Sequence, residues 1–213
     1  MPVGIPELLE GAKITMAASI FAILLGTLIG IAAGVAEQSR FVLLRAISAF
    51  YVSTIRGTPL YIQILVIYFL LPAIGLDIPR FTTGVLALAL NSGAYISQMI
   101  SGALTAIPKG QIEAARALAM PNASVWRRIV IPQALRLIVP PLTVEFTALV
   151  KNSAFLSVIG VVELTRTAQQ IISVSFKPTQ TWLVVAGIYF VMCFVIGLVA
   201  RRVERATGAQ AAR

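Results

Sequence analysis

Long apolar runs alternate with short polar connections along this chain. The apolar runs predict five membrane-spanning α-helices, over residues 12–36, 59–76, 81–104, 129–150 and 182–200. An α-helix that rises about 1.5 Å per residue needs roughly 20 residues to cross a bilayer, and each run is near that length. We therefore expect an all-α integral membrane protein in which residues 1–213 form a single transmembrane domain.

Two further segments are too polar to cross the bilayer. Residues 41–55 contain Arg45 and Ser48 and predict a helix that lies along the membrane interface. Residues 107–128 interrupt the apolar pattern with several charged side chains and predict short helices outside the membrane, with a break at Pro121.

Two local patterns concern how the spans begin and pack. Thr58 and Pro59 predict the start of the second span, because a hydroxyl N-cap followed by proline at the first helical position is favoured. Gly26, Gly30 and Gly34 share one face of the first span and would allow another backbone to approach closely. Glycine without such a role is equally compatible with a membrane helix, so both interpretations remain open.

Composition narrows the classes of function. Hydrophobic residues make up 58% of the chain and charged residues only 12%, which excludes a disordered, collagen-like or disulfide-stapled protein. Histidine is absent, and the single cysteine, Cys193, lies in an apolar run. The chain thus lacks the usual general base and the histidine of a hydrolase triad. We expect a membrane protein that is not an enzyme.

The distribution of basic residues predicts the orientation of the spans, because cytoplasmic connections are enriched in Lys and Arg. One side collects ten basic residues from the first, third and carboxyl-terminal connections: Arg40, Arg45, Lys109, Arg116, Arg127, Arg128, Arg201, Arg202, Arg205 and Arg213. The other side keeps five: Lys13, Arg80, Lys151, Arg166 and Lys177. We therefore expect the amino terminus outside and the carboxyl terminus in the cytoplasm. The net charge of +9 then mostly reflects the basic residues that set the orientation in the membrane. We therefore expect no nucleic-acid partner.

The most specific motif lies in the third connection. The sequence reads E-A-A-R-A-L-A over residues 113–119 and, nine residues later, I-V-I-P over residues 129–132. It resembles the EAA loop of ABC importer permeases, whose pattern is E-A-A, three residues, G, nine residues and I-x-L-P. Three further segments resemble the polar amino-acid branch of that family: R-G-T-P-L at 56–60, G-A-Y at 93–95 with I-P-K-G-Q at 107–111, and S-V-I-G-V-V-E-L-T at 157–165. The resemblance covers about residues 11–205, in order.

The resemblance implies the fold of a type I ABC importer permease, with five transmembrane helices, an interfacial helix and cytoplasmic coupling helices. It implies import of a polar amino acid or close derivative by alternating access, across a bacterial inner membrane. The implied partners are ABC ATPase subunits, an extracytoplasmic solute-binding protein, a second permease subunit, identical or paralogous, and membrane lipid. Coupling to the ATPases would involve Glu113, Ala114, Ala115, Arg116, Ala117 and Ala119.

The chain contains no P-loop motif G-x-x-x-x-G-K-[ST]. We therefore expect ATP and Mg²⁺ on the partner ATPases and no cofactor on this chain.

Among the positions that depart from the pattern of the family, two bear on the turn and on the cargo. Ala119 stands where the family usually has glycine, and if that glycine forms a positive-φ turn, Pro121 with Asn122 could make the turn instead. Gln98 stands where the amino-acid branch commonly has glutamate. A second buried carboxylate is then missing from this subunit, which implies that strongly cationic cargo is less favoured.

Six polar residues in the third and fourth spans form the candidate substrate-binding set: Asn91, Ser92, Tyr95, Gln98, Glu145 and Asn152. Within each span their spacing places them on or beside one helix face. Polar groups at bilayer depth are costly and normally face a cavity or another subunit. Glu145 suits the ammonium group of an α-amino acid, and amide or hydroxyl donors suit its carboxylate. The alternative is that these groups bond across helices and hold them together.

Two other classes of function remain open on the sequence. The first is a secondary transporter or channel subunit for a small polar solute, with no ATPase partner. Such carriers often contain internal repeats with paired broken helices, and the two halves of this chain show no convincing self-similarity. The second is a purely structural membrane subunit, which would leave the polar residues of the third span unexplained.

Overall fold

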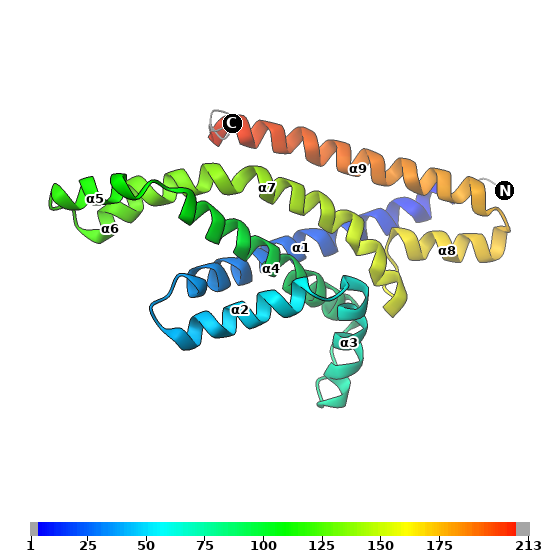
Figure 1. The fold of residues 1–213 in the computed structure, drawn as a ribbon. Coiled ribbons are helices and arrows are strands. Elements are labelled where there is room, and N and C mark those ends of the chain that lie inside the picture. The colour runs from blue at the N-terminus through cyan, green and yellow to red at the C-terminus, as the bar shows by residue number, and fades with distance from the viewer. Residues whose placement is uncertain (1–3, 208–213) are drawn as a thin grey trace.

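The computed structural model describes residues 4–207, which form helices and no strand (Figure 1). Arg213 of the predicted cytoplasmic set lies outside the described residues. The elements are α1 (Ile5–Glu37), α2 (Val42–Arg56), α3 (Leu60–Ala73), α4 (Arg80–Ala106), α5 (Lys109–Ala117), α6 (Asn122–Val125), the π-helical turn η1 (Trp126–Val130), α7 (Ile131–Asn152), the 3-10 helix η2 (Ser153–Ile159), α8 (Leu164–Ser175) and α9 (Pro178–Thr207). The predicted all-α fold is confirmed.

Helices α1 and α4 pack against each other at the centre, and α7 joins them and carries α9 on its other side (Figure 1). Helices α5 and α6 project at one end of the molecule (Figure 1). Helix α8 and the start of α1 lie at the opposite end, where they contact each other.

Glycine allows the close approach of α1 and α4. A Cβ atom on Gly30 would lie 2.6 Å from Cγ2 of Ile96, and one on Gly34 would lie 3.0 Å from the carbonyl oxygen of Ser97. Gly26 faces the carbonyl oxygen of Ala89 in the same way. The interpretation of these glycines as a close-packing face is confirmed, because each would place its missing side chain against α4.

We expect Gly30→Ala to lower the free energy of unfolding by about 1–3 kcal/mol, because the added methyl group must displace the buried side chain of Ile96. Gly197→Ala in α9 is the matched control, since no atom lies within 4 Å of its added Cβ. That change should stabilise the helix by about 0.5–1 kcal/mol. Unfolding of the two purified variants in detergent measures both effects, and equal stabilities would contradict the packing.

Helix α2 packs against α1 and α4 instead of lying apart from them. The Ser48 hydroxyl donates to the Ala33 carbonyl oxygen at 2.8 Å, and the Tyr51 hydroxyl donates to the carbonyl oxygen of Leu90. Both hydroxyls thus bond to the backbones of neighbouring helices, and the interfacial position of α2 stays a prediction.

The second predicted span corresponds to α3, and a bend of 112° separates it from α2. The predicted N-cap at Thr58 is wrong: Pro59 holds the N-cap position, and the Thr58 hydroxyl donates back to the Thr54 carbonyl oxygen at 2.9 Å. Helix α3 has 14 residues, or about 21 Å of rise, and is too short to cross a bilayer alone.

Within the described residues, three helices are long and apolar enough to cross a membrane: Ile5–Glu37, Asn122–Ile159 and Pro178–Thr207. The bent pair of α2 and α3 adds a fourth if it counts as one span. Helix α4 has 27 residues, but its polar residues lower its mean hydropathy. The count of five spans therefore stays a prediction.

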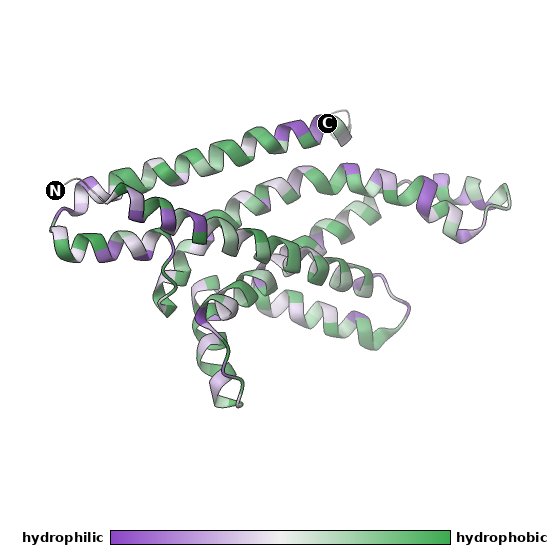
Figure 2. Ribbon diagram, turned by 180° about the vertical axis from the view of Figure 1, so that it is seen from behind, coloured by the Kyte–Doolittle hydropathy of each residue, from purple (hydrophilic) through white to green (hydrophobic). Residues whose placement is uncertain are grey.

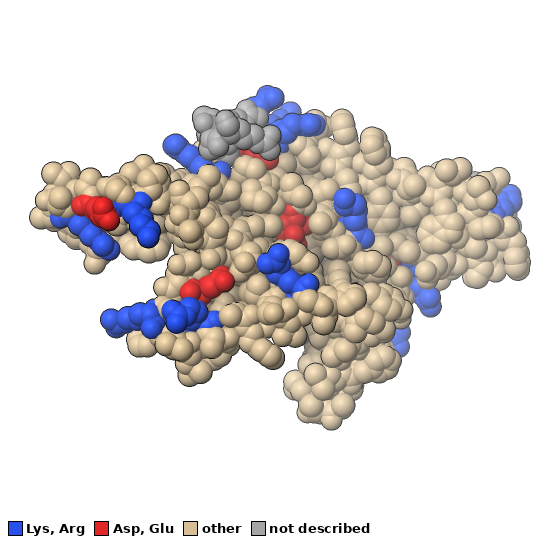
Figure 3. All heavy atoms as spheres, viewed as in Figure 1, with Lys and Arg blue, Asp and Glu red and all other residues tan. Residues whose placement is uncertain are grey.

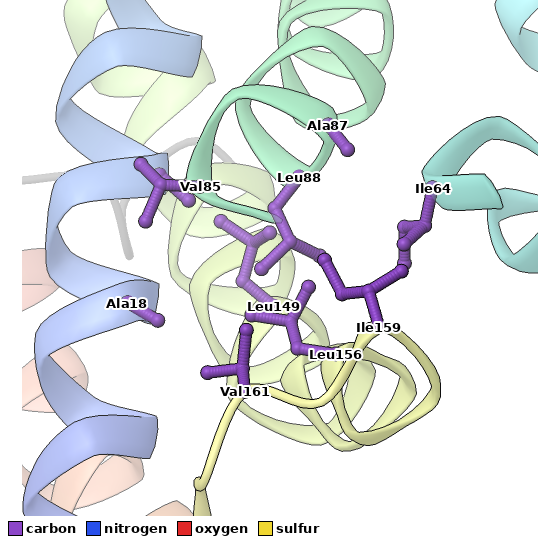
Figure 4. Packing of buried hydrophobic residues seen from close by; sticks show 10 residues of the cluster. Ala18, Ile64, Val85, Ala87, Leu88, Leu149, Leu156, Ile159 and Val161 are labelled. Atoms are coloured by element: carbon purple, nitrogen blue, oxygen red, sulfur yellow. The ribbon is translucent and has the colours of Figure 1, made fainter. Parts of the chain in front are cut away.

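The core between α1, α3, α4, α7 and η2 is small and aliphatic, with Leu88, Leu149 and Leu156 fully or almost fully buried (Figure 4). By contrast, hydrophobic residues predominate along the helices (Figure 2), and many of the large ones are exposed. Leu28 and Phe190 are examples, with 66% and 69% of their surfaces exposed. So much exposed apolar surface requires lipid or another protein chain to cover it.

Candidate functional site

The break between α2 and α3 is held by one side chain. The amide nitrogen Nε2 of Gln63 donates to the carbonyl oxygen of Ile55 at 2.6 Å, to that of Thr58 at 3.0 Å and to the Thr58 hydroxyl at 2.9 Å. The last carbonyl oxygens of a helix have no N–H partner within that helix. In apolar surroundings they need a side-chain donor such as the Gln63 amide. Gln63 thereby fixes the shape of the break.

Asn91 of α4 supports this arrangement. Its Nδ2 donates to Oε1 of Gln63 at 2.9 Å, and its side chain is buried. Asn91 therefore bonds across helices, as the alternative interpretation of the polar residues expected. In this structure the Asn91 side chain positions the break, and its role as a substrate ligand stays a prediction.

Ser92 and Glu145 meet where α4 packs against α7. Ser92 is fully buried, and its hydroxyl has no hydrogen-bond partner among the described residues. That hydroxyl lies beside the half-buried carboxylate of Glu145. Asn152 ends α7 two turns after Glu145 and shares its face. An unpartnered buried hydroxyl next to a carboxylate can bind a polar ligand.

Tyr95 lies one turn after Ser92 on α4 and is 37% exposed. The guanidinium carbon of Arg56 lies 5.5 Å from the centre of its ring, a cation–π contact. Arg56 is the last residue of α2, at the break. Sequence reasoning did not include Arg56 in the site, although an arginine between two apolar segments was a usable signal.

Gln98 has a different neighbour from the one that the sequence suggested. Its Nε2 donates to both carboxylate oxygens of Glu37, at 3.2 and 3.1 Å. Glu37 ends α1, 61 residues away in the sequence. A partly buried carboxylate therefore lies beside Gln98. The expectation that strongly cationic cargo is less favoured stays a prediction.

The segment that resembles the EAA loop folds as α5, a turn and α6, and it projects from one end of the molecule (Figure 1). Basic side chains gather on this end and near the connection between α1 and α2 (Figure 3). The exposed basic residues of these segments are Arg40, Arg45, Lys109, Arg116, Arg127 and Arg128. The projecting end therefore offers a positive surface to a partner or to lipid phosphates.

The predicted coupling residues divide into two groups. Glu113, Ala114, Arg116, Ala117 and Ala119 are exposed. Ala115 is buried against the apolar cluster that anchors α5 to α4 and α7, and its role in coupling stays a prediction.

Leu118 was not among the predicted coupling residues. It follows α5 directly and has 79% of its surface exposed. An exposed leucine at the tip of a projecting loop is suited to a hydrophobic contact with a partner.

Ala119 itself adopts the left-handed conformation, with φ of 55°. The expectation that Pro121 and Asn122 would replace the glycine turn is therefore wrong: the turn stays at residue 119 and alanine makes it. The Ala119 N–H donates to the Arg116 carbonyl oxygen and closes α5.

We expect Ala119→Gly to stabilise the protein by about 1 kcal/mol, because glycine adopts positive φ without the steric cost of Cβ. The comparison is thermal unfolding of the wild type and the variant in the same detergent. Ala117→Gly, inside helical α5, should instead destabilise it by about 0.5–1 kcal/mol. A destabilising effect of Ala119→Gly would contradict the turn.

A second buried polar cluster joins α1, α8 and α9. Glu163 is fully buried and caps α8: its carboxylate accepts from the backbone N–H groups of Thr165 at 2.9 Å and Arg166 at 2.8 Å. The Tyr189 hydroxyl of α9 donates to it at 3.1 Å, and the Thr15 hydroxyl of α1 at 3.4 Å. The sequence showed Glu163 only as part of a motif, without this role.

Comparison with known proteins decides the family. Residues 26–208 match the model of the family described as binding-protein-dependent transport system inner membrane component. The chain belongs to this family. The resemblance to ABC importer permeases is thereby confirmed, and the chain is a non-catalytic membrane subunit of such a transporter.

Similar permeases cover nearly the whole chain. The glutamine transport system permease protein GlnP of Escherichia coli K12 is 37% identical over 203 residues, which are 94% of this chain and 93% of that protein. The putative glutamine transport system permease protein GlnP of Rickettsia typhi is also 37% identical, over 93% of this chain and 91% of its own length.

Solved structures show the same permease fold. The crystal structure of an amino acid ABC transporter with histidines matches with a TM-score of 0.88 and 38% identity, covering 94% of both chains. The inward-facing MetNI methionine ABC transporter matches with a TM-score of 0.78 and 24% identity, covering 94% of this chain and 95% of its own. The second match supports the fold alone. The predicted type I importer fold is confirmed.

Proposed function

We propose that this permease moves a polar amino acid or close derivative into the cytoplasm as part of an ATP-driven importer. The observation that carries the proposal is the unpartnered Ser92 hydroxyl beside the half-buried Glu145 carboxylate, where α4 meets α7. Relatives named as glutamine permeases, and a similar amino acid transporter solved with histidines, support an amino-acid cargo.

In this proposal Glu145 binds the substrate ammonium group, because a carboxylate in apolar surroundings attracts a cation strongly. Ser92 and Tyr95 supply neutral hydrogen bonds, and Asn152 extends the polar face of α7. Gln98 with Glu37 offers a further polar contact at the end of α1. Asn91 bonds to Gln63 and so helps to fix the break between α2 and α3 beside the proposed substrate pathway.

Transport requires partners that this chain does not contain. Two ABC ATPase subunits would bind ATP and Mg²⁺ and dock on the exposed side of α5, and a solute-binding protein would deliver substrate at the opposite face. A second permease subunit would cover part of the exposed apolar surface, and lipid the rest. Shifting an inward–outward equilibrium from 1:99 to 99:1 takes about 5.5 kcal/mol, which nucleotide binding transmitted through α5 would provide.

The exposed basic residues around α5 and α6 support an orientation in the inner membrane with this end in the cytoplasm. The amino terminus would then lie outside and the carboxyl terminus inside.

Cysteine crosslinking tests the docking of ATPase subunits on α5. Cysteines at the exposed positions Ala114 and Ala117 should crosslink to cysteines on a co-expressed ABC ATPase. A cysteine at Ala115 is the matched control and should not react, because that position is buried inside the permease. Crosslinking at Ala115 but not at its neighbours, or at none of the three, would contradict the proposal.

A further inference from the structure

Arg56 is a charged residue without an acidic partner. It ends α2 at the bend of 112°, and its side chain is exposed. Among residues 4–207 the only ion pair joins Lys13 and Glu10, so no described carboxylate lies within 4.0 Å of the Arg56 guanidinium. No described group accepts a hydrogen bond from this guanidinium, so its donors are available to an anionic ligand.

Tyr95 orients this guanidinium. The contact of 5.5 Å between Arg56 and the Tyr95 ring holds the planar group against α4. Tyr95 lies three residues after Ser92, so the two side chains are neighbours on the surface of α4. Ser92 in turn lies beside Glu145. The guanidinium of Arg56 thus lies against Tyr95 of α4, and the carboxylate of Glu145 lies beside Ser92, one turn away on α4. The two charged groups do not form an ion pair with each other.

From this arrangement we infer that Arg56 binds the α-carboxylate of the substrate while Glu145 binds its ammonium group. An α-amino acid carries these opposite charges on one carbon atom, which suits two separate and unpaired charges along a single helix face. The guanidinium fork also matches carboxylate geometry, with two parallel N–H donors. Arg56 is then a specificity-determining residue for cargo that carries a free α-carboxylate. This inference rests on the proposed function.

Equilibrium binding to the complete permease–ATPase complex in nanodiscs, without the solute-binding protein, tests Arg56. The probes are L-glutamine, 4-aminobutanamide, which lacks the α-carboxylate, and 4-carbamoylbutanoate, which lacks the ammonium group. Arg56→Gln should weaken binding of glutamine and 4-carbamoylbutanoate by about 10- to 100-fold, as expected for a lost hydrogen-bonded charge. It should leave binding of 4-aminobutanamide unchanged, which also shows that the variant is folded.

Glu145→Gln is the matched control and should give the opposite pattern, weakening glutamine and 4-aminobutanamide but not 4-carbamoylbutanoate. Arg56→Lys should retain part of the affinity for glutamine, because it keeps the charge but not the planar fork. If Arg56→Gln weakens all three probes equally, or none, Arg56 only stabilises the end of α2 and the inference is wrong. If the wild-type complex binds no glutamine at all, the proposed function fails together with it.

Discussion

Replacing Glu145 with glutamine will lower uptake of α-amino acids by at least about 30-fold. The substitution keeps the size of the side chain and removes its charge, so the substrate ammonium group loses its counter-ion. Truncating one partner of a buried, hydrogen-bonded charge pair costs about 2–5 kcal/mol. Uptake of radiolabelled glutamine by proteoliposomes containing the complete transporter and a matched binding protein measures the loss.

Glu10→Gln is the matched control for this prediction. Glu10 pairs with Lys13 on an exposed surface, and such pairs contribute little to stability. Its substitution should leave uptake unchanged. Normal uptake by Glu145→Gln at equal protein incorporation would remove Glu145 from the path and leave it as a helix-packing group.

The second large effect is on stability. We expect Glu163→Ala to lower the free energy of unfolding by about 2–4 kcal/mol. The substitution removes the cap of α8 and leaves the partly buried donors of Thr165, Arg166 and Tyr189 without their acceptor. Thermal unfolding of the purified complex in detergent measures the change.

Tyr189→Phe provides a graded comparison. It removes one donor to Glu163 and leaves both backbone bonds of the cap in place, so it should cost about 1 kcal/mol. If Glu163→Ala were no more destabilising than Tyr189→Phe, the cap would not hold α8 and this view of the cluster would be wrong.

The sequence predicted the apolar helices because apolar runs determine them directly, but it predicted no helix where η2 and α8 form. It predicted the packing face of Gly30 for the same reason, since helical spacing alone places the three glycines together. It could not show that α2 packs on α1 and α4, because the carbonyl partners of Ser48 and Tyr51 lie on those helices, 15 and 39 residues away. A sequence shows that a side chain is polar, but it does not show which neighbouring group will be its hydrogen-bond partner.

The candidate site was predicted in part for a related reason. Helical spacing identified the polar face of α4, but the partners of Asn91 and Gln98 are 28 and 61 residues distant and lie on other helices. Only tertiary structure shows that these two amides are already bonded, whereas the Ser92 hydroxyl is not.

The coupling loop shows the same limit. Its motif indicated the segment but not its inward face, which includes Ala115. Nor did it indicate that Ala119 keeps a positive φ.

The central claim is that this permease imports an amino acid at the expense of ATP hydrolysed by partner subunits. The most direct measurement is accumulation of radiolabelled glutamine in proteoliposomes that contain the permease, its ABC ATPase and a matched binding protein. The account predicts accumulation above the external concentration with ATP, and none with a non-hydrolysable analogue or without the ATPase. Accumulation that needs neither ATP nor the ATPase would show a secondary transporter and would contradict the account.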